Sequence, residues 1–245
     1  MARLRSPEGC PWDREQTHES LKPHLIEECY ELIDAIDDRD DEMIREELGD
    51  LLLQVVLHAQ MASEDDRFNF DAVADSISEK LIRRHPHVFG DTKLSTSDAV
   101  LRQWDVIKRH EKKDRESALD GVPRLLPALA KAQKIQSRAA RVGFDWPDST
   151  GPLDKVKEEV IELEQTTGGE QLAEELGDLL FAVVNFARKS KLEAEDLLQA
   201  ATRKFSDRFR QMEILAEQRG LKFSDMSLAE MDQLWDEVKA YRRPA

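Results

Sequence analysis

The sequence EELGDLL occurs twice in this chain, at Glu46–Leu52 and again at Glu174–Leu180. In and after each copy, apolar residues recur at steps of three and four, which is the spacing of an amphipathic helix. Each copy also contains a glycine, Gly49 or Gly177, although a glycine inside a helix costs about 1 kcal/mol relative to alanine. We therefore expect another group to approach the helix backbone closely at both glycines.

The repeated heptapeptide belongs to a longer duplication. An EExxE pattern precedes it in both halves, at Glu27–Glu31 and at Glu158–Glu162. A lysine–arginine pair and then a tryptophan–lysine pair follow it, each with one helical turn between its members. These pairs are Lys80 and Arg84, Trp104 and Lys108, Lys204 and Arg208, and Trp235 and Lys239. Motifs that recur in one order indicate that a single unit has been duplicated.

The periodicity predicts an all-α protein, because steps of three and four dominate and β-branched alternation is nearly absent. We expect a tandem repeat of two four-helix-bundle-like units, residues 1–119 and 128–245, joined by the linker DGVPRLLP at 120–127. Helices are expected over residues 18–37, 43–63, 70–86, 97–113, 126–141, 153–166, 171–189, 194–219 and 228–241.

Composition narrows the range of partners. The chain has 245 residues and a formal net charge of −15, whereas binding to nucleic acid or to an anionic membrane normally needs a basic face. We therefore expect neither partner, and a multivalent cation is the more natural companion. No apolar stretch is long enough to cross a membrane, and no export segment is recognisable at the N-terminus. Cys10 and Cys29 have no CxxC spacing, which fits a reducing cytoplasm.

Acidic residues cluster in the second half. On a helix, Glu158 and Glu162 fall about 40° apart and Glu159 lies beside them. Glu175 and Asp178 are three residues apart on the next helix, so they also share one face. If the two helices pack antiparallel, the two sets of carboxylates face each other.

An apolar stripe should bury the first of these helices against its neighbour. The stripe consists of Leu153, Val156, Val160 and Leu163. Carboxylates that converge on a small volume raise one another's pKa unless a cation neutralises them. Oxygen ligands without sulfur or imidazole favour Mg²⁺, with Mn²⁺ as the alternative. A single acidic pair is more often a solvated surface, but the repetition of the same spacing in both halves favours a metal site.

Basic and aromatic residues supply the rest of a candidate nucleotide site. Lys204 and Arg208 can point together at an anion, such as a polyphosphate bound to the metal. Trp235 offers an aromatic face for a base, and Lys239 lies one turn further on. Taken alone, Trp235 would be a core residue and the two basic residues an ordinary surface turn. Their recurrence in both halves favours binding.

Other chemistries are excluded by what the second half lacks. All six histidines lie between His18 and His110, so the second half has no imidazole for a nucleophilic triad, a zinc site or a histidine base. The paired ExxH segments of a di-iron bundle are missing. Neither a Walker A sequence nor GxGxxG is present, so a glycine loop would not hold the phosphates.

The order EExxE, ExxD, KxxxR and WxxxK resembles the all-α nucleoside triphosphate pyrophosphohydrolases, and the two-unit layout is similar to the MazG type. CPWDREQT at 10–17 and VGFDWPD at 142–148 extend this resemblance over nearly the whole chain. The resemblance implies Mg²⁺-dependent hydrolysis of nucleoside triphosphates to the monophosphate and pyrophosphate. It also implies a homodimer.

The resemblance further implies roles for individual residues. The metal ligands would be Glu159, Glu162, Glu175 and Asp178, and Glu158 would assist water or substrate. The residues that hold the nucleotide would be Lys155, Lys204, Arg208, Trp235 and Lys239. The first-half counterparts of the metal ligands are Glu28, Glu31, Glu47 and Asp50, and the second unit is expected to be the active one.

Two alternatives remain open at this point. One is a helical regulatory module that binds nucleotide or a protein partner without turnover. The other is a narrower enzyme of the same superfamily that acts on dUTP or on a modified nucleotide.

Overall fold

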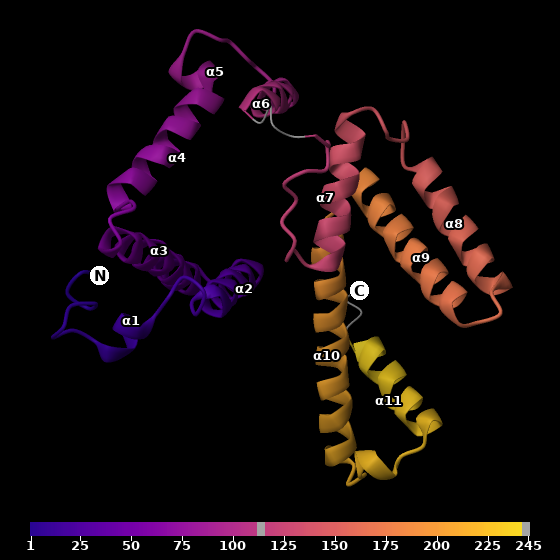
Figure 1. Cartoon of the computed structure of the whole chain (residues 1–245). Coiled ribbons are helices and arrows are strands. Elements are labelled where there is room, and N and C mark those ends of the chain that lie inside the picture. Colours follow the sequence, from indigo (N-terminus) through magenta and orange to yellow (C-terminus); the bar gives the residue numbers. More distant parts are fainter. Residues whose placement is uncertain (112–115, 242–245) are drawn as a thin grey trace. The chain divides into compact units, whose positions relative to one another are not determined.

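The computed structural model describes residues 1–111 and 116–241, and within these ranges every long element is an α-helix (Figure 1). The chain forms two compact units, Met1–Lys113 and Asp114–Ala245. The prediction of an all-α tandem repeat is confirmed. The segment 120–127, predicted as a linker, belongs to the second unit. It is attached there because the Arg138 guanidinium donates hydrogen bonds to the carbonyl oxygens of Asp120 and Gly121.

The described helices match the predicted ranges to within four residues at each end. The first unit contains α1 (Pro11–Glu15), α2 (Lys22–Asp38), α3 (Asp41–Glu64), α4 (Phe70–Arg84), α5 (Pro86–Phe89) and α6 (Ser97–Glu111). The second unit contains α7 (Ala128–Arg141), α8 (Thr150–Gln165), α9 (Glu170–Lys189), α10 (Ala194–Gln218), the 3₁₀ helix η1 (Phe223–Asp225) and α11 (Leu228–Tyr241). The short helices α1, α5 and η1 were not predicted, because single turns carry too little periodicity to be recognised.

Short turns create the two hairpins that matter for the site. In the first unit, Arg39 takes a left-handed conformation and the Asp40 side chain accepts hydrogen bonds from the amides of Glu42 and Met43, so α3 begins directly after α2. In the second unit, Gly168 and Gly169 have φ angles of 103° and 74° between α8 and α9, a region that favours glycine. Each hairpin packs its two helices together, α2 on α3 and α8 on α9.

The glycines of the repeated heptapeptide lie in open surroundings. A Cβ atom built on Gly49 or Gly177 meets no other atom within 4 Å. The expectation that another group of the chain approaches the backbone there is therefore wrong for the described part of this single chain.

The predicted burial of the apolar stripe of α8 is wrong for two of its four residues. Leu153 and Val160 are 38% and 39% exposed, whereas the buried residues of this helix are Pro152 and Glu159. The helix turns its acidic edge, not its apolar stripe, toward α9. Leu153 and Val160 lie at the surface of the chain, whereas Val156 and Leu163 are half-buried.

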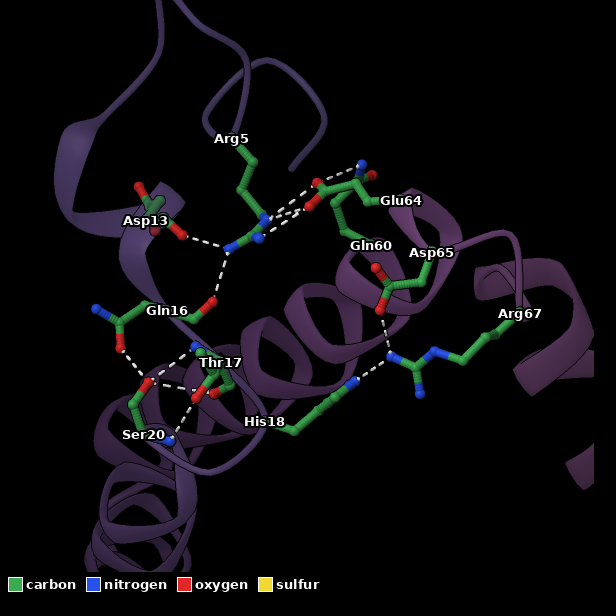
Figure 2. A network of polar contacts seen from close by, with 10 residues as sticks. All are labelled: Arg5, Asp13, Gln16, Thr17, His18, Ser20, Gln60, Glu64, Asp65 and Arg67. Carbon is green, nitrogen blue, oxygen red and sulfur yellow. Dashed lines mark hydrogen bonds and ion pairs between the residues drawn. The ribbon is translucent and has the colours of Figure 1, made fainter.

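A polar network ties the N-terminal segment to α3. Figure 2 shows Arg5 between the Glu64 carboxylate and the backbone carbonyl oxygens of Asp13 and Gln16. The segment is also anchored by Leu21, which packs in a buried cluster with Leu57 and Met61 of α3. Among the described residues, no helix is both long and apolar enough to cross a membrane.

Candidate functional site

The α8–α9 hairpin brings three carboxylates together. Glu159, Glu162 and Glu175 each offer a carboxylate oxygen, and these oxygens lie within 4.8 Å of one another. Glu159 is only 4% exposed. The contact arises because Glu159 and Glu162 lie on the same face of α8, at the three-residue spacing of helical neighbours, and Glu175 lies opposite them on α9.

Burial and mutual repulsion perturb this group. Partial burial raises the pKa of Glu175, and the negative charges of Glu162 and Glu159 raise it further. Lys155 offsets part of the charge, since its Nζ lies 2.7 Å from a Glu159 oxygen and 2.9 Å from a Glu158 oxygen. These two contacts raise the pKa of Lys155 well above its usual range, so it remains cationic.

Asp178 and Glu158 lie at the edges of the cluster. Asp178 is one turn beyond Glu175 on α9 and is not one of the three carboxylates in closest contact. Its charge nevertheless raises the pKa of Glu175, and it lines a pocket next to the cluster. The Glu158 side chain is 57% exposed and its carboxylate pairs with Lys155.

The pocket beside these acids has a volume of about 460 Å³. Its lining includes the charged side chains of Lys155, Glu159 and Asp178. The walls include three aromatic side chains, Phe144, Trp146 and Phe181. A small space lined by aromatic and charged side chains is a suitable site for a ligand with a flat apolar part and an ionic part.

A loop before α8 holds the aromatic wall in place. Asp145 binds Arg188 and Lys189 of α9, at 2.5 Å and 3.3 Å, and these bonds lower the pKa of its carboxyl group. Lys189 also donates a hydrogen bond to the Trp146 carbonyl oxygen at 2.6 Å. The Trp146 indole lies against Gly151, where an added Cβ would fall 2.0 Å from the indole carbon Cδ1. Only glycine therefore fits at position 151 with the indole in this place.

The sequence interpretation assigned no role to this aromatic wall. The sequence signal for it is the segment VGFDWPD at 142–148. Two aromatic side chains flank an aspartate in this segment, just ahead of the acidic helix. Only the structure shows that the aspartate binds α9 and thereby places the aromatic side chains beside the acids.

The residues predicted to hold the nucleotide from α10 and α11 are not brought to the acids. Arg208 lies over the Trp235 ring, 5.8 Å from its centroid, and the Lys239 Nζ is 3.3 Å from Asp236. Helix α11 packs on α10 around Met212. Within residues 116–241, no recorded polar contact links Lys204, Arg208, Trp235 or Lys239 to the carboxylates of α8 and α9.

The first unit contains a matching group of acids. Glu28, Glu47 and Asp50 have carboxylate oxygens within 4.8 Å of one another. Burial, followed by the charges of the neighbouring acids, raises the pKa of both Glu28 and Glu47. Glu31 lies outside this closest group, but its charge contributes to both shifts.

The residues around the two acidic clusters, one in each unit, differ at equivalent positions. When the EELGDLL segments are aligned, Gln54 of the first unit corresponds to Ala182 of the second. Gln54 is 5% exposed and hydrogen-bonds Glu28, whereas Ala182 lines the pocket. Alignment of the EExxE segments places His24 opposite Lys155. The second unit thus has the lysine and the smaller side chain next to its acids.

The sequence that forms this site is shared with known proteins. The model of the MazG nucleotide pyrophosphohydrolase domain matches residues 16–89 and 153–212. The chain is 50% identical to the nucleoside triphosphate pyrophosphohydrolase/pyrophosphatase MazG of Thermotoga maritima, with 98% of this chain and 92% of the relative covered. It is 49% identical to a nucleoside triphosphate pyrophosphohydrolase of Escherichia coli K12, with 98% and 94% covered. Both repeats of the acidic hairpin lie within the matched residues, so the chain belongs to the MazG nucleotide pyrophosphohydrolase family.

Proposed function

We propose that this chain hydrolyses nucleoside triphosphates to the nucleoside monophosphate and pyrophosphate at the α8–α9 site of the second unit. The observation that carries the proposal is the direct contact between the three-carboxylate cluster and the pocket with aromatic walls, since Glu159 belongs to both. The activities for which the relatives from T. maritima and E. coli are named support it.

The residues of the cluster fit a divalent metal ion. Three carboxylate oxygens converge from two helices, and hard oxygen ligands of this kind suit Mg²⁺ or Mn²⁺. Glu159, Glu162 and Glu175 would hold the ion, with Asp178 next to them on the pocket side. When bound, the ion would neutralise phosphate charge and lower the pKa of a coordinated water.

The chain's own side chains would position the substrate. The aromatic side chains would stack the nucleoside, and the triphosphate would extend toward the carboxylate cluster that Glu159 shares with the pocket. Lys155, already cationic and within reach of Glu158 and Glu159, would bind phosphate oxygens. The exposed Glu158 carboxylate would accept a proton from the attacking water. Attack at the α-phosphorus would expel pyrophosphate, whose growing charge Lys155 is placed to stabilise.

We also propose that two copies of the chain associate through the α8–α9 hairpin. Its exposed apolar residues recur along one side of each helix, and they include Leu153, Val160, Leu176, Leu180 and Val183, all between 38% and 58% exposed. Two antiparallel helices form half of a four-helix bundle, so a second copy of the hairpin would bury this face.

Product analysis tests the proposed reaction. The purified protein is incubated with a mixture of nucleoside triphosphates and Mg²⁺, and the products are separated by anion-exchange chromatography. Equal amounts of monophosphate and pyrophosphate are expected. Diphosphate with inorganic phosphate would place the attack at a different phosphorus and contradict the proposal.

We place the protein in the cytoplasm as part of the same proposal. Cys10 and Cys29 are free thiols, which suits a reducing compartment. Cell fractionation followed by immunoblotting tests this location.

A further inference from the structure

Two buried glutamines one turn apart on α7 differ in the hydrogen bonds that their side-chain amides make. Gln133 and Gln136 are each 6% exposed. The Gln133 amide nitrogen donates to the Leu192 carbonyl oxygen at 3.0 Å and to Glu193 at 2.9 Å, and its oxygen accepts from the Ala194 amide at 2.8 Å. Gln133 therefore uses both ends of its amide to join α7 to the turn before α10.

Gln136 uses only one end. Its amide nitrogen donates to the Phe181 carbonyl oxygen at 2.8 Å, which establishes the orientation of the amide because a carbonyl oxygen can only accept. The Gln136 Oε1 atom is buried and has no hydrogen-bond partner among the described residues. Buried acceptors are nearly always paired, so this oxygen requires an explanation.

The position of Gln136 explains why its oxygen has no partner, because this residue lines the pocket of the second unit. The cationic side chains of the pocket already have partners. Arg188 donates to Asn185 Oδ1 at 2.9 Å and pairs with Asp145, and Lys155 is bound to Glu158 and Glu159. These cations are already engaged, and a ligand in the pocket can supply a donor for Gln136.

We propose that Gln136 is a specificity-determining residue whose Oε1 accepts a hydrogen bond from an N–H group on the edge of the nucleobase. This inference rests on the proposed function, in which the same pocket holds the nucleoside. The Gln136 oxygen is buried in this structure, so binding requires a change in the side-chain torsions that brings the oxygen to the pocket and weakens the bond of the nitrogen to Phe181. A base without an edge N–H leaves the acceptor unpaired and binds more weakly.

Three purine substrates test the proposal. ATP and GTP carry N–H donors on the base edge, whereas purine riboside triphosphate has the same ring system without them. In the wild type, kcat/KM is expected to be about tenfold higher for ATP, for GTP or for both than for the donorless substrate. In Gln136→Met, which removes the acceptor at similar volume, that preference should fall to near one, chiefly through KM.

Two further variants give the controls. Gln133→Met should lower the melting temperature but keep the preference, because Gln133 serves only the fold. If Gln136→Met fails to fold, Gln136→Glu is measured in its place. This variant retains an acceptor and should keep the preference. A wild-type preference near one, or an unchanged preference in folded Gln136→Met, overturns the proposal.

Other results would show that the proposed hydrolysis, and not the role of Gln136, is wrong. A wild type that releases no pyrophosphate from any nucleoside triphosphate contradicts the proposed reaction. Unchanged KM values in Ala182→Phe, which fills the pocket, show that the nucleoside binds elsewhere. A folded Gln136→Met variant with unchanged preference, in an enzyme that is active and sensitive to Ala182→Phe, refutes only the role of Gln136.

Discussion

Glu159 shows how a single side chain combines structure with chemistry in this protein. It is almost fully buried and faces two further acids, and among the described residues its recorded ion pair is with Lys155. Buried charge of this kind is costly unless it is paired or binds a cation. A site whose buried charges reduce stability in this way is a strong candidate for function.

Removal of one carboxylate of the cluster tests whether the cluster holds a catalytic metal ion. Glu175→Gln is expected to reduce kcat roughly 100-fold or more, because it removes a charge that acts on the reacting phosphate through the metal. The helical circular dichroism spectrum should stay unchanged. Glu47→Gln is the matched variant in the first unit and should matter less, because the resemblance assigns activity to the second unit. Equal losses in both variants would show that both units are catalytic.

Gly151 is predicted to control substrate binding through Trp146. In Gly151→Ala the new methyl group would collide with the indole, and displacement of this wall should raise KM on the order of tenfold with little change in kcat. Gly49→Ala is the matched control, since a Cβ at that position meets nothing. It should leave KM unchanged and stabilise the helix by about 1 kcal/mol, measured by urea unfolding. An unchanged KM in Gly151→Ala would show that Trp146 does not contact the substrate.

The contact between the N-terminal segment and α3 depends on neutral histidines. Arg67 donates to His18 Nε2 at 2.8 Å, and because arginine has no acceptor, this nitrogen must carry no proton. The proton of neutral His18 is then on Nδ1, from which it is donated to His58 Nδ1 at 2.7 Å. Protonation of either ring would break one of these bonds and add positive charge close to Arg67, whose partner there is Asp65.

Stability should therefore decrease on mild acidification. Burial lowers the pKa of His58 below its ordinary value of 6.5, with a smaller effect from His18. As pH falls, the unfolded chain takes up this proton first, so the stabilisation is complete above about pH 6.5 and is lost as pH falls through the folded-state pKa. Urea unfolding of the first unit at pH 7.5 and pH 5.5 measures the effect.

His58→Gln is the control for this prediction, because it removes the titrating ring. The raised pKa values of Glu28 and Glu47 act in the opposite direction, and they remain in the variant. The free energy of unfolding should therefore fall more between these two pH values in the wild type than in His58→Gln. Equal changes would contradict the role of the histidine pair.

For the molecule as a whole, the exposed apolar residues are as informative as the buried ones. Core clusters such as Val184 with Ala187 and Ala194 are small, whereas several leucines and valines of α8 and α9 remain exposed. Large exposed apolar patches mark interaction sites. This distribution is expected of a chain whose hydrophobic core is completed by association.

Disruption of the α8–α9 face should therefore separate the two copies. Leu180 is 58% exposed in the single chain, and Leu180→Glu would bury an unpaired charge in the proposed interface. The dissociation constant should rise on the order of 100-fold or more, as measured by sedimentation velocity over a concentration series. Leu125→Glu is the control, since Leu125 is 88% exposed and lies outside the hairpin. A wild type that sediments as a monomer would rule out the dimer.

Much of this architecture was predictable from the sequence. The long helices followed from steps of three and four, because an amphipathic helix needs only local periodicity to be recognised. The duplication followed from motif order. The contact of Glu159 and Glu162 with Glu175 followed from the same periodicity, once α8 and α9 were joined by a short turn.

Three features depended on packing between distant segments and were not evident from local pattern. The α8 stripe containing Leu153 was expected to be buried, but the side facing α9 is the acidic one, because periodicity identifies an apolar face and not the partner that covers it. The pocket exists because Asp145 reaches Arg188 across the fold. The unpaired oxygen of Gln136 is visible only when every neighbour is known. Sequence periodicity therefore specified helices and their acidic faces, while long-range contacts specified which side chains enclose the ligand.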